Sequence, residues 1–244
     1  MTQKHILATS AGFVSTNRWG VLKPGANMVK ALELSGKERP RVLFIMTASG
    51  DDRSYITSSY QALSSASCDV DHLALFAQPT APVEESIGKA AVIWVGGGSV
   101  ANLLALWKLH GVDDALRDAY ERGAVLGGVS AGSICWHVGG PTDSFGPELQ
   151  TVTNALALVP FGNGVHSDSE EQRRPLLQKL VGESVLPLSY ATDDRVGIHY
   201  LNGEPHEVIS DVDADPLNGP AAYRVEKVGI DVVETRLPVG LITP

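Results

Sequence analysis

The chain has 244 residues, of which 43% are hydrophobic and 19% are charged. This composition is typical of a folded globular protein and excludes bulk disorder. The formal net charge of −9 disfavours non-specific binding to a phosphate backbone, so we expect no nucleic-acid partner.

Short apolar runs recur along the first half of the chain, and several carry no polar residue. Such runs are typical of strands buried on both faces of a parallel sheet. They predict strands over residues 6–9, 42–46, 70–76, 92–95 and 124–129. Between them, apolar side chains recur at helical spacing over residues 55–63 and 112–120. This alternation of strands and helices predicts an open α/β sheet with right-handed crossovers.

Two stretches without Asp, Glu, Lys or Arg, residues 90–107 and 123–142, meet the bare length of a membrane span. Glycine clusters interrupt both, so we expect a buried strand, a turn and a helix in each, and no membrane partner. The N-terminus shows no signal-peptide pattern. Cys68 and Cys135 have no metal-ligand spacing. They indicate buried thiols and a cytoplasmic protein.

The second half of the chain has a different character. Residues 141–164 are expected as a long loop with one apolar stretch at 155–160. A helix is expected over 175–181, with Pro175 as its first residue and Gly182 just past its end. Strands are predicted over 185–190, 196–200, 207–209 and 221–225, and Asn202-Gly203 predicts a hairpin turn. We expect a single domain over residues 1–244, a mostly parallel core with an antiparallel C-terminal extension.

The sharpest motif is Gly128-Val129-Ser130-Ala131-Gly132, which follows an apolar strand and precedes a buried helix. In that context G-x-S-x-G predicts a nucleophile elbow, a strained turn that exposes the serine hydroxyl. The amide of Ala131 would donate to an oxyanion. The competing interpretation is a glycine-rich turn that only packs helix on strand, and Ser133 is a weaker candidate nucleophile.

Gly96-Gly97-Gly98-Ser99 ends the preceding predicted strand. Glycines let backbone amides approach a ligand closely, so Gly97 or Gly98 is expected to supply the second oxyanion donor. A phosphate-binding loop is the alternative, but neither G-x-G-x-x-G nor Gly-Lys-Ser/Thr is present.

A serine nucleophile needs a general base and an acid that orients it. His166 lies in a loop of glycine and small polar residues and is a candidate base, although a solvated surface histidine fits the same pattern. Asp193 and Asp194 are candidate acids. On extended backbone only one of them can face the crevice.

These motifs resemble the peptidase E (aspartyl dipeptidase) family, related to cyanophycinase. The resemblance rests on the triple glycine, Asn102, Trp107, the elbow, residues 142–147, the His166 loop, residues 171–175 and the Asp193-Asp194 turn. It implies a flavodoxin-like sheet of the class I glutamine amidotransferase type. The activity it implies is that of a serine dipeptidase for Asp-X peptides, with no metal and no cofactor.

Carried onto this chain, the resemblance makes Ser130 the nucleophile, His166 the base, and Asp194, or less favourably Asp193, the acid. The family usually has glutamate as the acid. The family's common loop is Gly-Gly-Gly-Asn-Thr, whereas here Ser99-Val100 follow the three glycines, and Val165 replaces the usual proline before the histidine.

A small Asp-X peptide would present a carboxylate and an ammonium group. Arg173 and Arg174 are the candidates for the carboxylate, against a solvated charge pair at a helix start. Asp143 is the candidate for the ammonium group. An α/β-hydrolase-type esterase and a non-catalytic binding module of the same fold are the alternative functions. The sequence leaves the oligomeric state open, a homodimer included.

Overall fold

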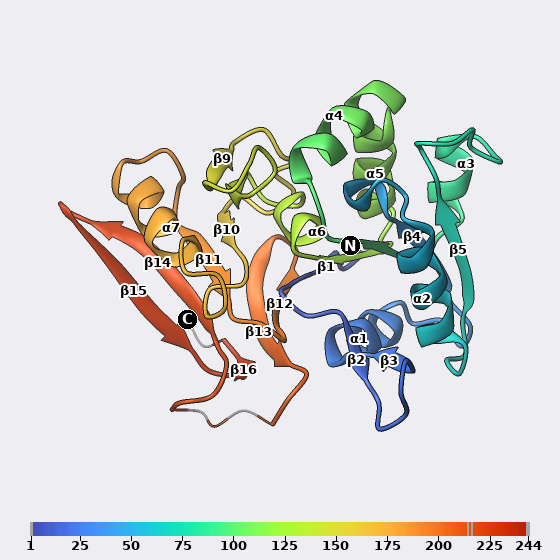
Figure 1. Cartoon of the computed structure of the whole chain (residues 1–244), viewed down its shortest axis with the longest axis horizontal. Helices are drawn as coiled ribbons and strands as arrows, with labels where there is room; N and C mark the ends of the chain where they lie inside the picture. Colours follow the sequence, from blue (N-terminus) through green and yellow to red (C-terminus); the bar gives the residue numbers. More distant parts are fainter. Residues whose placement is uncertain (1, 214, 216, 243–244) are drawn as a thin grey trace.

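The structure, a computed structural model, describes residues 2–213, 215 and 217–242 (Figure 1). Its largest unit is an eight-stranded sheet in the order β16-β13-β12-β1-β7-β6-β4-β5. The parallel strands are β1 (His5–Thr9), β7 (Val125–Val129), β6 (Val92–Val95), β4 (Arg41–Ile45) and β5 (Asp69–Leu73). The antiparallel strands are β12 (Val196–Leu201), β13 (Glu204–Ser210) and β16 (Gly240–Leu241).

The parallel strands β1, β4, β6 and β7 are almost entirely buried, as their apolar composition predicts, whereas the edge strand β5 exposes Asp69 and His72. In β4, Leu43 and Ile45 join one hydrophobic core, while Val42 and Phe44 join the core on the opposite face. Side chains of a strand alternate between faces, so an uninterrupted apolar run serves two cores.

Helices cover both faces of this sheet (Figure 1). One face carries α3 (Val83–Gly88), α4 (Val100–His110), α5 (Val112–Glu121) and α6 (Ala131–Ile134), and the other carries α1 (Ala26–Leu34) and α2 (Arg53–Leu63). The 3₁₀ turn η1 spans Thr47–Ser49. No helix in the described part of the chain has both the length and the apolar character that crossing a bilayer demands. The two charge-free stretches form β6 followed by α4, and β7 followed by α6.

A second sheet of four strands stands beside the first, in the order β10-β11-β14-β15 (Figure 1). Its strands are β10 (Gly162–Gly164), β11 (Ser189–Thr192), β14 (Ala222–Val228) and β15 (Asp231–Leu237), with α7 (Arg173–Gly182) packed on it. Strands β10 and β11 are parallel, and the other pairs are antiparallel. Two small hairpins complete the fold, β2 (Phe13–Ser15) with β3 (Leu22–Pro24), and β8 (Gly140–Thr142) with β9 (Gln150–Val152).

The predicted fold class is confirmed: a mostly parallel α/β sheet with an antiparallel C-terminal extension. The Asn202-Gly203 turn joins β12 to β13, with both residues at positive φ. The long loop predicted over 141–164 is wrong, because it contains β9, β10 and most of β8. The helix predicted from Pro175 begins earlier, at Arg173, and the strand predicted over 185–190 is shifted to Ser189–Thr192.

Candidate active site

Ser130 follows β7 directly and has φ 57° and ψ −113°, a left-handed conformation that a non-glycine residue rarely adopts. The glycines of the motif permit this turn by close backbone contact. A Cβ on Gly128 would lie 2.4 Å from the carbonyl oxygen of Gly132, and one on Gly132 would lie 2.2 Å from that of Val95. The local geometry is therefore that of a nucleophile elbow.

Two backbone segments flank the Ser130 side chain. Ala131 is the first residue of α6, so its amide has no acceptor within the helix. Gly97 packs against the elbow, and a Cβ there would lie 3.3 Å from Ser130 Cβ. The Gly97 amide donates toward the Tyr55 hydroxyl and so opposes the rise in the pKa of Tyr55 that burial causes. Gly98, at φ 132°, packs against the backbone of Ala48 and Ser49.

His166 and Asp194 are brought together by the parallel pairing of β10 and β11. Gly164 pairs with Ala191, and each strand ends within two residues of its functional side chain. His166 Nδ1 lies 2.5 Å from Asp194 Oδ1. A carboxylate only accepts, so Nδ1 carries the proton and Nε2 is the basic ring nitrogen.

Two hydrogen bonds donated by backbone amides also join the two turns. The amide of Ser167 donates to the carbonyl of Thr192 at 3.1 Å, and the amide of Asp194 donates to Asp168 Oδ1 at 2.8 Å. The His166 side chain keeps 20% of its surface exposed, so the ring is held in place while remaining accessible.

Asp193 points elsewhere. Its carboxylate accepts hydrogen bonds from the amide of Ala221 and the hydroxyl of Tyr223, both at 3.0 Å. Burial raises the pKa of Asp193, and these two hydrogen bonds oppose that rise. Of the two adjacent carboxylates, Asp194 is the one in contact with His166.

Ser10 links the elbow to the histidine turn. Thr9 pairs with Val129, and the carbonyl of Thr9 accepts from the amide of Ser130 at 3.0 Å. The next residue, Ser10, accepts at its Oγ from the amide of His166 at 2.9 Å. Its hydroxyl also lies 2.7 Å from Thr192 Oγ1. Ser130 and His166 are therefore anchored to consecutive residues of one strand end.

Within the described residues, the Ser130 hydroxyl makes no hydrogen bond to His166. Catalytic hydrogen bonds of ligand-free enzymes are often loose and tighten when substrate binds.

Ser130, His166 and Arg195 all have positive φ, at 57°, 56° and 67°. Left-handed non-glycine residues are strained, and such residues cluster at functional sites.

Arg173 is almost completely buried, with 3% of its side chain exposed. It donates to Glu170 Oε2 at 2.7 Å and to the carbonyl of Pro141 at 2.9 Å, and its Nη2 lies 3.7 Å from Asp143 Oδ1. The predicted carboxylate reader and the predicted ammonium reader thus form an ion pair with each other. Arg174 points to the second sheet, where it pairs with Glu234 and stacks over Tyr223.

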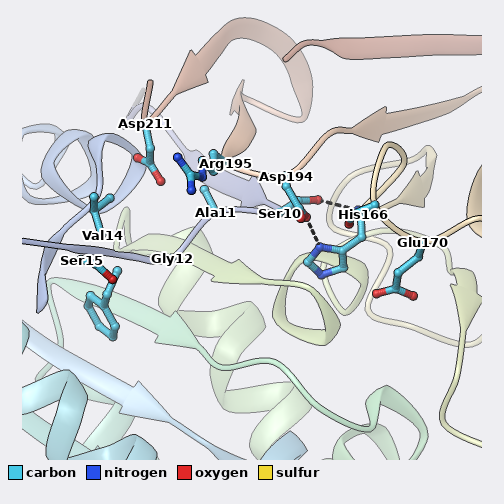
Figure 2. Close-up of a pocket in the computed structure, with 12 residues that line it drawn as sticks. Ser10, Ala11, Gly12, Val14, Ser15, His166, Glu170, Asp194, Arg195 and Asp211 are labelled. Atoms are coloured by element: carbon cyan, nitrogen blue, oxygen red, sulfur yellow. Dashed lines mark hydrogen bonds and ion pairs between the residues drawn. The ribbon is translucent and has the colours of Figure 1, made fainter. Parts of the chain in front are cut away.

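A cavity of about 520 Å³ opens beside His166 and Asp194 (Figure 2). Its lining includes Ser10, Glu170 and Arg195, which sequence reasoning did not identify as site residues. Ser10 could have been found, because it follows a predicted strand whose end must lie beside that of β7. Asp143 lines a separate cavity, which Glu170 also borders.

An α/β-hydrolase-type esterase has the chain order serine, acid, histidine, and would need Asp143 with His166, or Asp194 with His199 or His206. None of these pairs is formed among the described residues. Asp143 lies against Arg173, and His199 hydrogen-bonds His5 at 3.0 Å. The described part of the chain also holds no group of three or more His, Cys, Asp or Glu side chains that could bind a metal ion. Cys68 and Cys135 are buried and unpaired.

Sequence comparison with known proteins identifies a family and a relative. The model of peptidase family S51 matches residues 23–208. The chain is 38% identical over 208 residues to the uncharacterized peptidase YgaJ of Bacillus subtilis (strain 168), an alignment that covers 85% of this chain and 87% of the relative.

Two crystal structures share the fold. One is a candidate peptidase E protein from Listeria monocytogenes EGD-e, at a TM-score of 0.58 and 19% identity, covering 97% of this chain and 100% of that one. The other is a peptidase from an acI-B1 Actinobacterium, at a TM-score of 0.72 and 16% identity, covering 98% and 96%. The predicted resemblance to peptidase E is confirmed at the level of the family and the fold.

Proposed function

The chain belongs to peptidase family S51, and on that premise we propose that it is a serine dipeptidase that hydrolyses Asp-X dipeptides. The observation that carries the proposal is the hydrogen bond between His166 Nδ1 and Asp194 Oδ1, 2.5 Å long, beside the strained elbow of Ser130. Nucleophile, base and acid follow one another along the chain as Ser130, His166 and Asp194. This order favours a family S51 peptidase over an α/β-hydrolase, in which the acid precedes the histidine.

In the proposed reaction, His166 Nε2 takes the proton of the Ser130 hydroxyl as Ser130 Oγ attacks the peptide carbonyl. Asp194 keeps Nδ1 protonated and stabilises the imidazolium that forms. The amide of Ala131, together with Gly97 or Gly98, would stabilise the oxyanion. His166 then gives its proton to the leaving amine, and water releases aspartate from the acyl-enzyme.

Substrate recognition is proposed for the acidic and basic groups around this pair. Glu170 borders the cavity that His166 lines, and Asp143 borders a second cavity that Glu170 also borders, so we propose these two carboxylates for the α-ammonium group. Arg173 forms ion pairs with both carboxylates and would position them for the substrate. Arg174 is less favoured than Arg173 for substrate binding, because its guanidinium already forms an ion pair with Glu234.

The test is hydrolysis of Asp-Leu by the purified chain and by its Ser130→Ala variant, each with and without a chelator. The wild type should cleave the peptide in both conditions, and Ser130→Ala should lose roughly 10³–10⁶ in rate. Ser133→Ala is the matched control, because its hydroxyl hydrogen-bonds Asn163 inside the protein. Full activity in Ser130→Ala would contradict the proposed mechanism. Loss of the wild-type activity on adding the chelator would contradict it as well.

A further inference from the structure

The cavity that His166 and Asp194 line has room for a small peptide. Its volume of about 520 Å³ falls within the roughly 300–1,000 Å³ of small-molecule sites. In Figure 2, His166 and Glu170 lie toward one end, and Arg195 and Asp211 lie toward the other. Ser10 and Ala11 lie between them, so a ligand in this cavity can touch the histidine and Arg195 together.

The backbone of Arg195 is fixed in an unusual conformation. Its φ is 67°, a left-handed value that is strained for an arginine. Its amide donates to the carbonyl of Ser10 at 3.2 Å, and its carbonyl accepts from the amide of Asp211 at 2.9 Å. These contacts hold the turn that follows Asp194 and direct the Arg195 side chain over the cavity (Figure 2).

The guanidinium of Arg195 makes no hydrogen bond or close ion pair with a described carboxylate, although its charge attracts that of Asp211 and so opposes the rise in the pKa of Asp211 that burial causes. Asp211 is its acidic neighbour in the cavity, but Asp211 Oδ1 already accepts from the amide of Ala26 at the start of α1. Arg173 and Arg174 differ, because both are paired with glutamates. Arg195 is thus the arginine of this region whose donors remain available.

We propose that Arg195 is a specificity-determining residue, which binds a carboxylate of the peptide substrate in the cavity next to His166. The proposal rests on the proposed function for the identity of the substrate. A guanidinium offers two parallel donors, which suit a carboxylate better than a lysine ammonium does. A dipeptide such as Asp-Leu has two carboxylates, one on the first side chain and one at the C-terminus, and the experiment separates them.

The experiment measures binding, so that it does not depend on turnover. Calorimetry on the Ser130→Ala protein compares Asp-Leu with Asn-Leu, which lacks the side-chain charge, and with Asp-Leu amide, which lacks the terminal charge. The same three peptides are then measured after adding Arg195→Gln or Arg195→Lys. Arg122→Gln is the matched control, an exposed arginine at the end of α5 outside the cavity.

We expect the parent to prefer Asp-Leu, and Arg195→Gln to lose about 10- to 100-fold in its affinity, the range of a charge-assisted hydrogen bond. Arg195→Lys should recover part of that loss, and Arg122→Gln should change nothing. Loss of the Asp-Leu over Asn-Leu preference assigns Arg195 to the side chain. Loss of the preference for Asp-Leu over Asp-Leu amide assigns Arg195 to the C-terminal carboxylate.

Equal affinities for all three peptides in the parent would overturn the proposal, as would an Arg195→Gln variant that behaves like Arg122→Gln. Failure of the proposed function has a different signature, which is the absence of Ser130-dependent hydrolysis of any of the three peptides. A chain that binds Asp-Leu through Arg195 without cleaving it would keep this inference and lose the peptidase assignment.

Discussion

The amide of His166 donates to Oγ of Ser10 at 2.9 Å, although the two residues are 156 positions apart in the chain. Ser10 directly follows the central strand β1, and His166 belongs to the turn after β10 in the second sheet. This hydrogen bond therefore joins the two sheets at the place where the candidate nucleophile and base must meet. Since His166 has a left-handed φ of 56°, its conformation depends on such external anchors.

Replacing Ser10 by alanine should impair turnover more than substrate binding. The change leaves the amide of His166 without its acceptor, a loss worth about 1–3 kcal/mol. We expect kcat to fall on the order of 10-fold while KM stays within about 2-fold, because the ring is misplaced and the cavity is otherwise intact. Steady-state kinetics on Asp-Leu measure both constants.

Thr192→Ser is the control for this prediction. It keeps the hydroxyl that faces Ser10 at 2.7 Å and removes only a buried methyl group. Its kcat per folded molecule should match the wild type. A Ser10→Ala enzyme with normal kcat would show that two other hydrogen bonds, Ser167 to Thr192 and Asp194 to Asp168, are enough to hold the His166 turn.

The two adjacent aspartates should separate catalysis from stability. Asp194→Asn removes the carboxylate that fixes the protonated Nδ1 of His166, and kcat should fall roughly 10²–10⁴-fold. Asp193→Asn instead disturbs the buried contacts with Ala221 and Tyr223. It should lower the melting temperature and leave kcat of the folded enzyme within a few-fold of wild type.

Kinetics and thermal unfolding of both variants check this prediction. The reverse pattern, with turnover lost in Asp193→Asn and kept in Asp194→Asn, would reassign the acid. Equal losses of kcat in both variants would indicate that either substitution disturbs the whole turn.

The elbow at Ser130 could be predicted because its cause is local. The turn lies between an apolar strand and a buried helix and contains two glycines, all within a short segment. Its conformation therefore depends on residues that are neighbours in sequence. The two-sided burial of β4 and β6 could be predicted for the same reason, since a short apolar run rich in β-branched residues is typical of a strand buried on both faces.

The His166–Asp194 contact could not be derived from local pattern, because it depends on the pairing of β10 with β11. Strand β10 is Gly-Asn-Gly, which has no β-branched or aromatic residue, and the segment around it was predicted as a loop. Its strand geometry comes from its partner, β11. Similarly, Arg173 looked like a surface residue at a helix start, and only the approach of Pro141 and Glu170 buries it.

Stability should fall in acid because His137 and His199 are buried in their neutral forms. Burial lowers the pKa of His137 to about 4 and that of His199 to about 3, from an ordinary value of 6.5. His137 Nδ1 donates to the carbonyl of Ser133, so Nε2 accepts from the Tyr200 hydroxyl, and protonating it would disturb that pair.

Because both pKa values are lower in the folded state, the unfolded chain takes up protons first as pH falls below about 6.5. The free energy of unfolding should therefore decrease from pH 6.5 down to about pH 4 for His137 and about pH 3 for His199, by up to about 1.4 kcal/mol per pH unit for each group. Urea unfolding across this range measures the slope.

His137→Gln should be less stable than wild type at pH 7 yet show a shallower slope between pH 6.5 and 4, because the titrating group is gone while a polar side chain remains. His199→Gln should flatten the slope over the wider range. If both variants keep the wild-type slope, other groups, the paired carboxylates first among them, govern the acid sensitivity of the fold.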